Sequence, residues 1–134
     1  MGERVIMNRE ILFKAKRIDN GEWVEGFIFE FKNKFYITEM AQTFMTAYYT
    51  AESVLDFNMR AYEIKPDTLC QYTGLTDKND KKIWENDLLG HKLNRVEFLN
   101  GTYCINGDRS LFFEANTNEV IGNIFDNPEL LEAE

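Results

Sequence analysis

Hydrophobic and polar residues alternate along the first forty positions of the chain, which is the pattern of half-buried β-strands. The alternating runs cover residues 10–18, 22–31 and 35–38. The segments DNG and KNK separate these runs, and Asn, Asp and Gly are residues that tight turns favour. The pattern therefore predicts an antiparallel β-meander.

The second of these runs carries apolar side chains on both of its faces. Trp23 and the phenylalanines of the run, among them Phe29, lie on one face, whereas Val24 and Ile28 lie on the other. A small chain cannot easily bury both faces of one sheet, so we expect an apolar patch that a second copy covers. This reasoning predicts a homo-oligomer. A helical lid formed by residues 39–62 is the competing explanation.

Residues 39–62 change to a helical period. Apolar residues recur there at spacings of three and four: Met40, Phe44, Ala47, Tyr48 and Ala51. The stripe predicts one irregular helix, or two short ones, packed on the core. Pro66 then fixes its own φ angle and favours extended geometry at Lys65, so residues 63–67 are interpreted as a connector.

Short strands and tight turns fill the rest of the chain. Strands are predicted at residues 69–72, 95–99, 102–105, 110–114 and 119–125, and residues 86–90 open a β-rich stretch. Asn100-Gly101 is a strong hairpin signal, and Asn127 followed by Pro128 favours the start of a short C-terminal helix.

The whole pattern predicts an α+β, strand-dominated fold in two subdomains. Residues 7–62 form the meander with its helical segment, and residues 63–134 form a second β unit that ends in the short helix. A small SH3-like barrel is one form that this second unit can take, by fold analogy alone. Residues 1–6 precede a second methionine and are interpreted as an extension.

The chain is strongly acidic, because 15 lysines and arginines face 23 aspartates and glutamates, for a net charge of −8. Binding along a phosphate backbone needs a basic face, so the charge disfavours nucleic acid as a partner. A local basic patch is the alternative, and its candidates lie in the first meander: Lys14, Lys16, Arg17, Lys32 and Lys34. No apolar run approaches the roughly 20 residues of a membrane span, so we expect a cytoplasmic protein without a membrane partner.

Cysteine and histidine are scarce. Cys70 and Cys104 lie outside any CxxC motif, and a reducing cytosol favours buried thiols over a disulfide. His91 is the one histidine, so these residues cannot form a structural zinc site without carboxylates. A Cys–His nucleophile pair has no orienting neighbour, and the glycine motifs that bind phosphate do not occur. We therefore predict no catalytic residue, no cofactor and no metal.

The densest group of carboxylates lies between residues 77 and 87. Its members are Asp77, Asp80, Glu85 and Asp87. An EF-hand is excluded, because Lys82 stands where that loop needs Gly and Leu88 where it needs Glu. Asp77, Glu85 and Asp87 are weak candidates for a metal-dependent enzyme that acts on nucleic acid. A solvated hairpin tip with alternating charges explains the group more simply, and Asp87 can instead satisfy turn amides.

Four segments spread along the chain carry a family signature. They are REILFKA at residues 9–15, DTLCQYTGLTDKN at 67–79, IWENDL at 83–88 and VIGNIFDNPELL at 120–131. Together they resemble the motifs of the YopX family of phage and prophage proteins. Asp80 and Asn86 stand where this family usually has glycine. Asn79 or Asp80 can supply the left-handed residue of the first turn and Asn86 that of the second, because Asn and Asp tolerate a positive φ angle. The resemblance therefore implies the family's backbone, with left-handed residues at these two turns.

The resemblance implies a phage-encoded accessory protein, because the family has no established activity or catalytic residue. We expect the protein to act through association with an unknown host or phage protein and not as an enzyme. Within the second segment, Gln71, Tyr72, Thr73 and Gly74 form a polar, aromatic strip that can serve recognition. The same residues can instead fix an unusual backbone, with Gly74 at a bend and Thr73 bonded to the turn.

Overall fold

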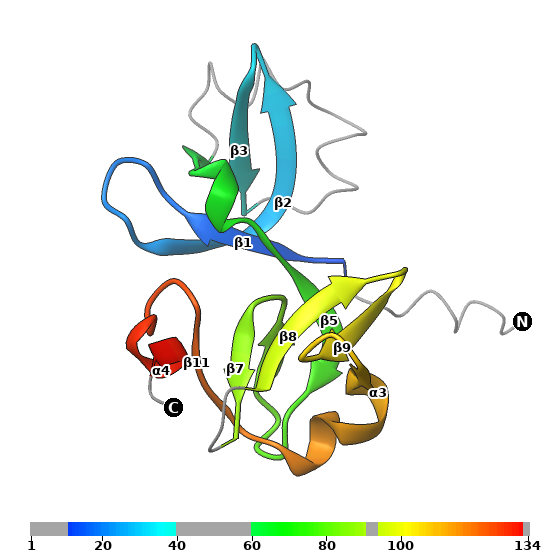
Figure 1. The fold of residues 1–134 in the computed structure, drawn as a ribbon. Helices are drawn as coiled ribbons and strands as arrows, with labels where there is room; N and C mark the ends of the chain where they lie inside the picture. The colour runs from blue at the N-terminus through cyan, green and yellow to red at the C-terminus, as the bar shows by residue number, and fades with distance from the viewer. Residues whose placement is uncertain (1–10, 40–59, 91–93, 133–134) are drawn as a thin grey trace, which may run out of the picture. The chain divides into compact units, whose positions relative to one another are not determined.

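The computed structural model describes residues 11–39, 60–90 and 94–132, and it shows an α+β, strand-dominated fold (Figure 1). The strands pair in antiparallel fashion and form two sheets, which confirms the predicted fold class. The described residues divide into two compact units, residues 11–71 and residues 72–132. They are called the N-terminal unit and the C-terminal unit.

The N-terminal unit is built on a β-meander, as predicted. Its strands are β1 (Phe13–Lys16), β2 (Trp23–Phe31), β3 (Lys34–Thr38) and β4 (Ala61–Glu63), and the first residues of β5 (Cys70–Thr76) pair with β1. Neighbouring strands follow the order β4-β3-β2-β1. Lys32 and Asn33 join β2 to β3 with φ angles of 52° and 67°, the left-handed geometry that matches the twist of a two-residue hairpin.

The core of the N-terminal unit lies on the face of β2 that carries Val24 and Ile28. Its buried residues are Ala15, Val24, Ile37 and Ile64. Ile28 packs against this cluster. Phe29, one residue further along the strand, lies on the opposite face and stacks on Tyr36, with ring centroids 5.4 Å apart. Both faces of β2 therefore carry apolar side chains, as the alternation predicted.

The helix predicted over residues 39–62 is wrong at its C-terminal end. Residues 40–59 lie outside the described residues, but Ala61 and Tyr62 belong to strand β4. They pair with Thr38 and Ile37. Pairing with β3 satisfies their backbone groups and lets the Tyr62 ring pack against the core, which the helical spacing of the preceding residues did not reveal.

The connector around Pro66 is tied to β1. Pro66 begins the single turn η2 (Pro66–Thr68), and Lys65 before it is extended, with a φ angle of −85°. The hydroxyl group of Thr68 accepts the N–H of Lys16 at 2.9 Å and donates to the carbonyl of Lys65 at 2.7 Å. The extended geometry predicted before the proline is confirmed.

The C-terminal unit contains the rest of β5, which pairs with β6, and a sheet with the order β10-β9-β8-β7-β11. Its further elements are β6 (Lys82–Trp84), β7 (Asp87–Leu89), β8 (Asn94–Leu99), β9 (Thr102–Ile105), β10 (Arg109–Ser110), α3 (Leu111–Glu114), η3 (Ala115–Thr117), β11 (Val120–Asn123) and α4 (Glu129–Glu132). The core consists of Ile83, Leu89, Val96, Ile105, Leu111, Ala115 and Val120. The SH3-like barrel stays a prediction.

The turns of this unit follow the sequence closely. Asn100 and Gly101 have φ angles of 53° and 82°, which is the predicted two-residue hairpin between β8 and β9. Asp80 and Asn86 have φ angles of 64° and 74°. Both of these residues thus adopt the left-handed geometry that was expected where the family usually has glycine.

The strand predicted at residues 110–114 is wrong. The strand ends at Ser110, and α3 begins at Leu111. Leu111 and Ala115 are buried at 0% and 3% exposure, and their spacing of four places both on one side of a helical turn. In a strand, Phe113 would share the buried face of Leu111 and Ala115, whereas the helical turn buries Leu111 and leaves both Phe112 and Phe113 in solvent.

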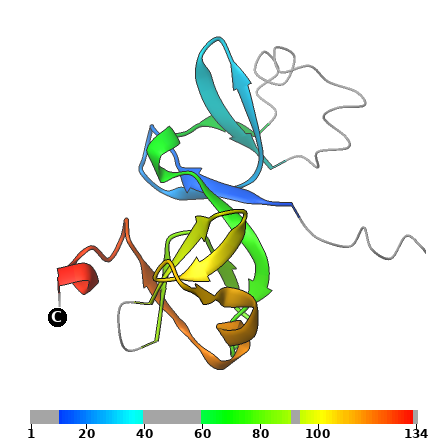
Figure 2. The ribbon, with the colours of Figure 1, turned by 45° about the vertical axis from the view of Figure 1, so that its right-hand side comes forward.

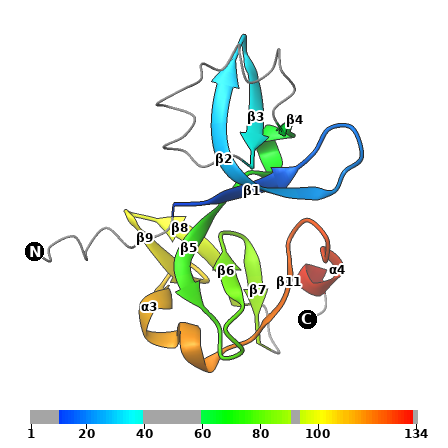
Figure 3. The same ribbon diagram turned by 180° about the vertical axis from the view of Figure 1, so that it is seen from behind.

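The two short helices lie on opposite sides of the C-terminal unit. Figure 2 and Figure 3 show α3 beside β9 and α4 beyond β11 from two further directions. Helix α4 begins just after Pro128, which confirms the predicted C-terminal helix.

Gly26 of β2 offers a test of this packing. A Cβ atom at this position would lie 2.1 Å from the carbonyl oxygen of Thr38. Because that oxygen belongs to the backbone of β3, Gly26→Ala should destabilise the protein by about 3 kcal/mol in denaturant unfolding. Gly21→Ala is the control, since open space surrounds Gly21 and only its φ angle of 74° opposes a side chain, for about 1 kcal/mol. Equal losses in the two variants would contradict the close approach of β2 and β3.

Candidate functional site

The Asp77 carboxylate is buried in the C-terminal unit, with 3% exposure. One oxygen, Oδ1, accepts the backbone N–H groups of Asn79 and Lys81 at 2.8 and 2.9 Å. The other, Oδ2, accepts the N–H of Val120 at 2.9 Å. The expected solvated hairpin tip is therefore wrong for Asp77, because a strand 43 residues away covers this carboxylate.

These contacts also set the charge state of Asp77. Burial acts to raise the pKa of the carboxyl group, but the hydrogen bonds from Val120, Lys81 and Asn79 outweigh it, with help from the charge of Lys81. The pKa of Asp77 therefore lies below its ordinary value. The carboxylate is charged at neutral pH and is occupied by three backbone donors.

Asp87 has a similar structural task at the next turn. It is 3% exposed, and its Oδ2 accepts the N–H of Trp84 at 2.8 Å. This contact confirms the simpler interpretation of Asp87 as a residue that satisfies turn amides. Glu85 is half-buried. Across the described part of the chain, no three side chains of the His, Cys, Asp or Glu types are placed to hold a metal ion together.

The recognition strip follows β5. Gln71 pairs with Phe13 of β1, and Tyr72 pairs with Trp84 of β6, with ring centroids 5.6 Å apart. The hydroxyl group of Thr73 donates to the carbonyl of Ile83 at 2.7 Å and accepts the N–H of Leu75 at 3.2 Å.

The backbone geometry of Gly74 interrupts the strand pairing next to the Thr73 hydroxyl group. The φ angle of Gly74 is 85°, and the register between β5 and β6 shifts between Tyr72 and Thr76. Thr73 and Gly74 therefore shape a bulge, because the hydroxyl supplies hydrogen bonds where the ladder is interrupted. Recognition by this strip stays a prediction.

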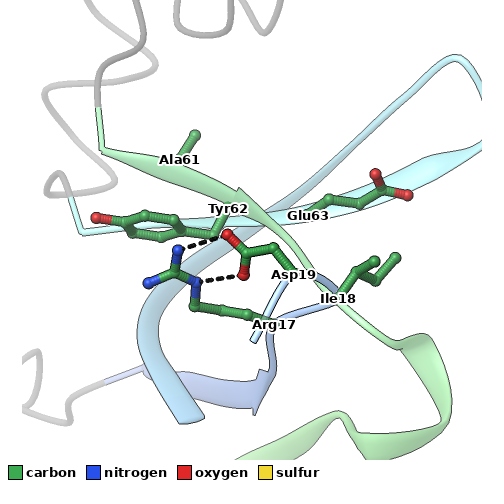
Figure 4. Close-up of a pocket in the computed structure, with 6 residues that line it drawn as sticks. All are labelled: Arg17, Ile18, Asp19, Ala61, Tyr62 and Glu63. Atoms are coloured by element: carbon green, nitrogen blue, oxygen red, sulfur yellow. Dashed lines mark hydrogen bonds and ion pairs between the residues drawn. The ribbon is translucent and has the colours of Figure 1, made fainter. Parts of the chain in front are cut away.

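A cavity of about 310 Å³ lies in the N-terminal unit (Figure 4). It is lined by Arg17, Ile18, Asp19, Ala61, Tyr62 and Glu63. The Arg17 Nε and Nη2 atoms donate to the two carboxylate oxygens of Asp19 at 3.0 and 2.7 Å. The guanidinium carbon lies 4.1 Å from the centroid of the Tyr62 ring.

The Arg17–Asp19 pair is charged over a wide pH range. Its hydrogen bond raises the pKa of Arg17 and lowers the pKa of Asp19, and partial desolvation opposes both shifts. The cavity could not be predicted from the sequence, because Tyr62 stands 45 positions beyond Arg17 and beside a segment with a helical pattern. An Arg-x-Asp segment just after a strand was the one local signal.

The most exposed large apolar side chains of the described chain belong to α3. Phe112 and Phe113 are 70% and 78% exposed, and their rings meet edge to face with centroids 5.3 Å apart. Phe98 and Leu99, at the end of β8, are 49% and 44% exposed. The exposure of Phe112 and Phe113 could not be predicted from the sequence, because the local pattern of these residues is typical of a strand.

The lysines of the first meander lie against aromatic rings. The Nζ atoms of Lys14 and Lys16 are 4.5 and 5.4 Å from the centroid of Trp23, and that of Lys32 is 5.2 Å from Phe31. Such contacts attach the cations to the sheet. A nucleic-acid interface built on them stays a prediction.

The thiols of Cys70 and Cys104 are buried, and neither forms a disulfide, as predicted. His91, the histidine of the hypothetical nucleophile pair, lies outside the described residues. In the part of the chain that the structure describes, no helix is long and apolar enough to cross a bilayer.

Comparison with known families decides the relationship that the motifs suggested. The family model described as "YopX protein" matches residues 12–132, which is nearly the whole chain. The chain belongs to the YopX family. No curated protein matches it. Family membership thus covers both units and the segments that contain Asp77, Asp87 and the recognition strip.

Asp77 should make the stability of this YopX protein depend on acid. The pKa of a depressed carboxyl group is lower in the folded than in the unfolded chain, where it is about 3.9. Its stabilising contribution is present above the unfolded pKa and is lost as pH falls through the folded pKa. Asp77→Asn should therefore cost about 2–3 kcal/mol in denaturant unfolding at neutral pH, and this difference should shrink below about pH 4.

Asp67→Asn is the control for that measurement, because Asp67 is exposed on η2. It should leave the free energy of unfolding nearly unchanged. A difference between wild type and Asp77→Asn that stays constant from neutral to acid pH would contradict the role assigned to the charged carboxylate.

Asp80 should tolerate glycine. Its φ angle of 64° strains a residue with a side chain, and its side chain is exposed. Asp80→Gly should be neutral or should stabilise the protein by about 0.5–1 kcal/mol in thermal or denaturant unfolding. Clear destabilisation would show instead that the Asp80 carboxylate makes a specific contact, as a site residue would.

Proposed function

We propose that this YopX protein is a phage- or prophage-encoded accessory protein that acts by binding another protein and not by catalysis. The observation that carries this proposal is the pair of exposed phenylalanines on α3. Burying a phenylalanine stabilises a protein by about 1.5–3 kcal/mol relative to leaving it exposed. Leaving two adjacent ones in solvent forgoes this gain, which is typical of a surface that a partner covers.

The way α3 is held supports the same role. Leu111 and Ala115 fix the helical turn in the core at 0% and 3% exposure. Arg109 of β10, just before the helix, and Glu114 at the end of the helix are joined by a hydrogen-bonded ion pair of 3.0 Å. The two phenylalanine rings are thus presented on an anchored turn, and preorganised aromatic side chains dominate the energetics of many protein interfaces.

The predicted homo-oligomer belongs to this proposal, with a second copy as one partner that α3 can bind. Ile28 is not a suitable contact for that copy, because it packs against the core. We place the protein in the cytoplasm of the bacterial host. The alternative of a metal-dependent enzyme has weaker support, because backbone amides occupy the carboxylates of Asp77 and Asp87.

Phe112→Ser combined with Phe113→Ser tests the proposal. Both side chains are exposed, so the double variant should keep its stability to within about 0.5 kcal/mol. Tagged wild type and double variant are compared in capture experiments from the host, with the bound proteins quantified by mass spectrometry. A partner that wild type retains should be lost by about ten-fold or more in the double variant.

Ile121→Ser is the matched control, because Ile121 is a 41% exposed apolar residue of the same unit. It should retain the partner. Light scattering coupled to gel filtration measures self-association. The wild-type protein should be an oligomer, and the double variant should be a 15.8 kDa monomer. Identical captured proteins and identical mass in wild type and double variant would refute binding through α3.

A further inference from the structure

The Arg17 side chain in the cavity of the N-terminal unit has hydrogen-bonding capacity that the protein does not use. A guanidinium group carries five N–H donors. The Asp19 carboxylate takes two of them, from Nε and Nη2. Among the described residues, no other group accepts a hydrogen bond from the Arg17 side chain. The Nη1–Nη2 edge, with its two parallel N–H groups, therefore remains available.

This edge is held in place from several sides. Asp19 accepts hydrogen bonds from the guanidinium group along its Nε–Nη2 edge. The Tyr62 ring covers one face of that group, with the ring centroid 4.1 Å from the guanidinium carbon. The backbone of Arg17 is fixed as well, because its N–H donates to Glu22 at 2.9 Å and its carbonyl accepts from Gly21 at 3.0 Å. Arg17 is 24% exposed on its side chain. Such a donor pair loses little freedom when it binds a ligand.

The geometry of the donors selects the chemistry of the ligand. Two parallel N–H groups match the two oxygens of a carboxylate. Figure 4 shows the outer nitrogen of Arg17 and the hydroxyl group of Tyr62 on the same side, away from Asp19, so the hydroxyl can add a third donor. The volume of about 310 Å³ is at the small end of ligand cavities and suits a side chain or a chain end.

The charges around the cavity limit the ligand further. Asp19 repels an anion, because it occupies the adjacent Nε–Nη2 edge of the guanidinium group, but its side chain is 65% exposed, so solvent weakens this repulsion. Strand alternation places Glu63 on the other face of β4 from Tyr62, and Figure 4 shows its carboxylate pointing away from the tyrosine ring. The lining holds one positive and two negative groups, so it repels a singly charged carboxylate less than a doubly charged phosphate.

We propose that Arg17 and Tyr62 form a binding site for a single carboxylate group. The Nη1–Nη2 edge of Arg17 donates two parallel hydrogen bonds to the carboxylate, and the Tyr62 hydroxyl donates a third. The carboxylate comes from an acidic side chain or from the C-terminus of a peptide. The site lies in the N-terminal unit and is independent of the α3 surface.

Nuclear magnetic resonance titration of the full chain tests this site with small probes. The carboxylate probes are acetate, the peptide Ac-Gly-Gly-Gly-OH with a free C-terminus, and the amidated peptide Ac-Gly-Glu-Gly-NH₂. The neutral control is Ac-Gly-Gln-Gly-NH₂. We expect saturable shifts of the Arg17 Nε–H signal and of the Tyr62 amide with the carboxylate probes and none with the neutral peptide. The tighter of the two peptides identifies the source of the carboxylate.

Three variants assign the shifts to this geometry. Arg17→Lys keeps the charge but has no planar edge, so the Kd should rise about ten-fold. Tyr62→Phe keeps the ring and should raise the Kd about three-fold, the value of one hydrogen bond. Arg95→Gln is the matched control, because Arg95 also lies beside a carboxylate, that of Glu97 at 3.5 Å, but in the other unit, and it should leave the Kd unchanged.

A spectrum that keeps the dispersed signals of both units shows that each variant is folded. The proposal is overturned if no carboxylate probe gives saturable shifts, or if the glutamine peptide binds as well as the glutamate peptide. It is also overturned if a folded Arg17→Lys protein binds the probes with the wild-type Kd, because the Nη1–Nη2 edge of the guanidinium group would then not contribute to binding.

Discussion

The C-terminal unit depends on the hydrogen bonds of one buried carboxylate, that of Asp77. Its two oxygens join the turn between β5 and β6 to the first residue of β11, 43 positions further along the chain. Lys78 adds a backbone bond to the carbonyl of Asn118 at 2.9 Å, just before the same strand. A buried carboxylate is costly unless its oxygens are satisfied, and here three amides satisfy them. Because the Asp77 carboxylate must be satisfied, its hydrogen bonds fix β11 relative to the turn between β5 and β6.

This anchor also determines how α3 is displayed. The chain between β10 and β11 has only the residues of α3 and η3 and two more in which to return to the sheet. Val120, at its end, is held by Asp77 and belongs to the same core cluster as Leu111 and Ala115. With both ends and the inner side of the turn fixed, the side chains of Phe112 and Phe113 point into solvent. A partner-binding surface of the kind proposed thus follows from the packing of the unit.

Local features of this fold could be predicted from the sequence, because they depend on residues close in the chain. The hairpins at Lys32-Asn33 and Asn100-Gly101 follow from turn chemistry, and Asp80 and Asn86 adopt the left-handed geometry expected of them. The alternation of β2 showed two apolar faces. It did not show that Ile28 faces the core while Phe29 lies opposite, because that depends on strands that pair later in the chain.

The errors have the same origin in contacts between distant residues. Leu111 begins a helix in place of the predicted strand, because it packs in one core cluster with Ala115 and Val120. The sequence around Asp77 predicts an exposed turn, because the amide that covers its carboxylate belongs to Val120, which is distant in the sequence. The cavity at Arg17 combines a turn with β4, and the spacing of the preceding apolar residues predicted a helix there. Sequence patterns reveal the period of an element better than its partner.

Amide hydrogen exchange measured residue by residue tests the role of Asp77 most directly. If one carboxylate holds the turn and the strand together, the amides of Asn79, Lys81 and Val120 exchange slowly in the wild-type protein. In Asp77→Asn the exchange of all three should accelerate together, while the amides of the N-terminal core strands keep their rates. Unchanged protection of Val120 in that variant would contradict the account, because β11 would then be held without the carboxylate.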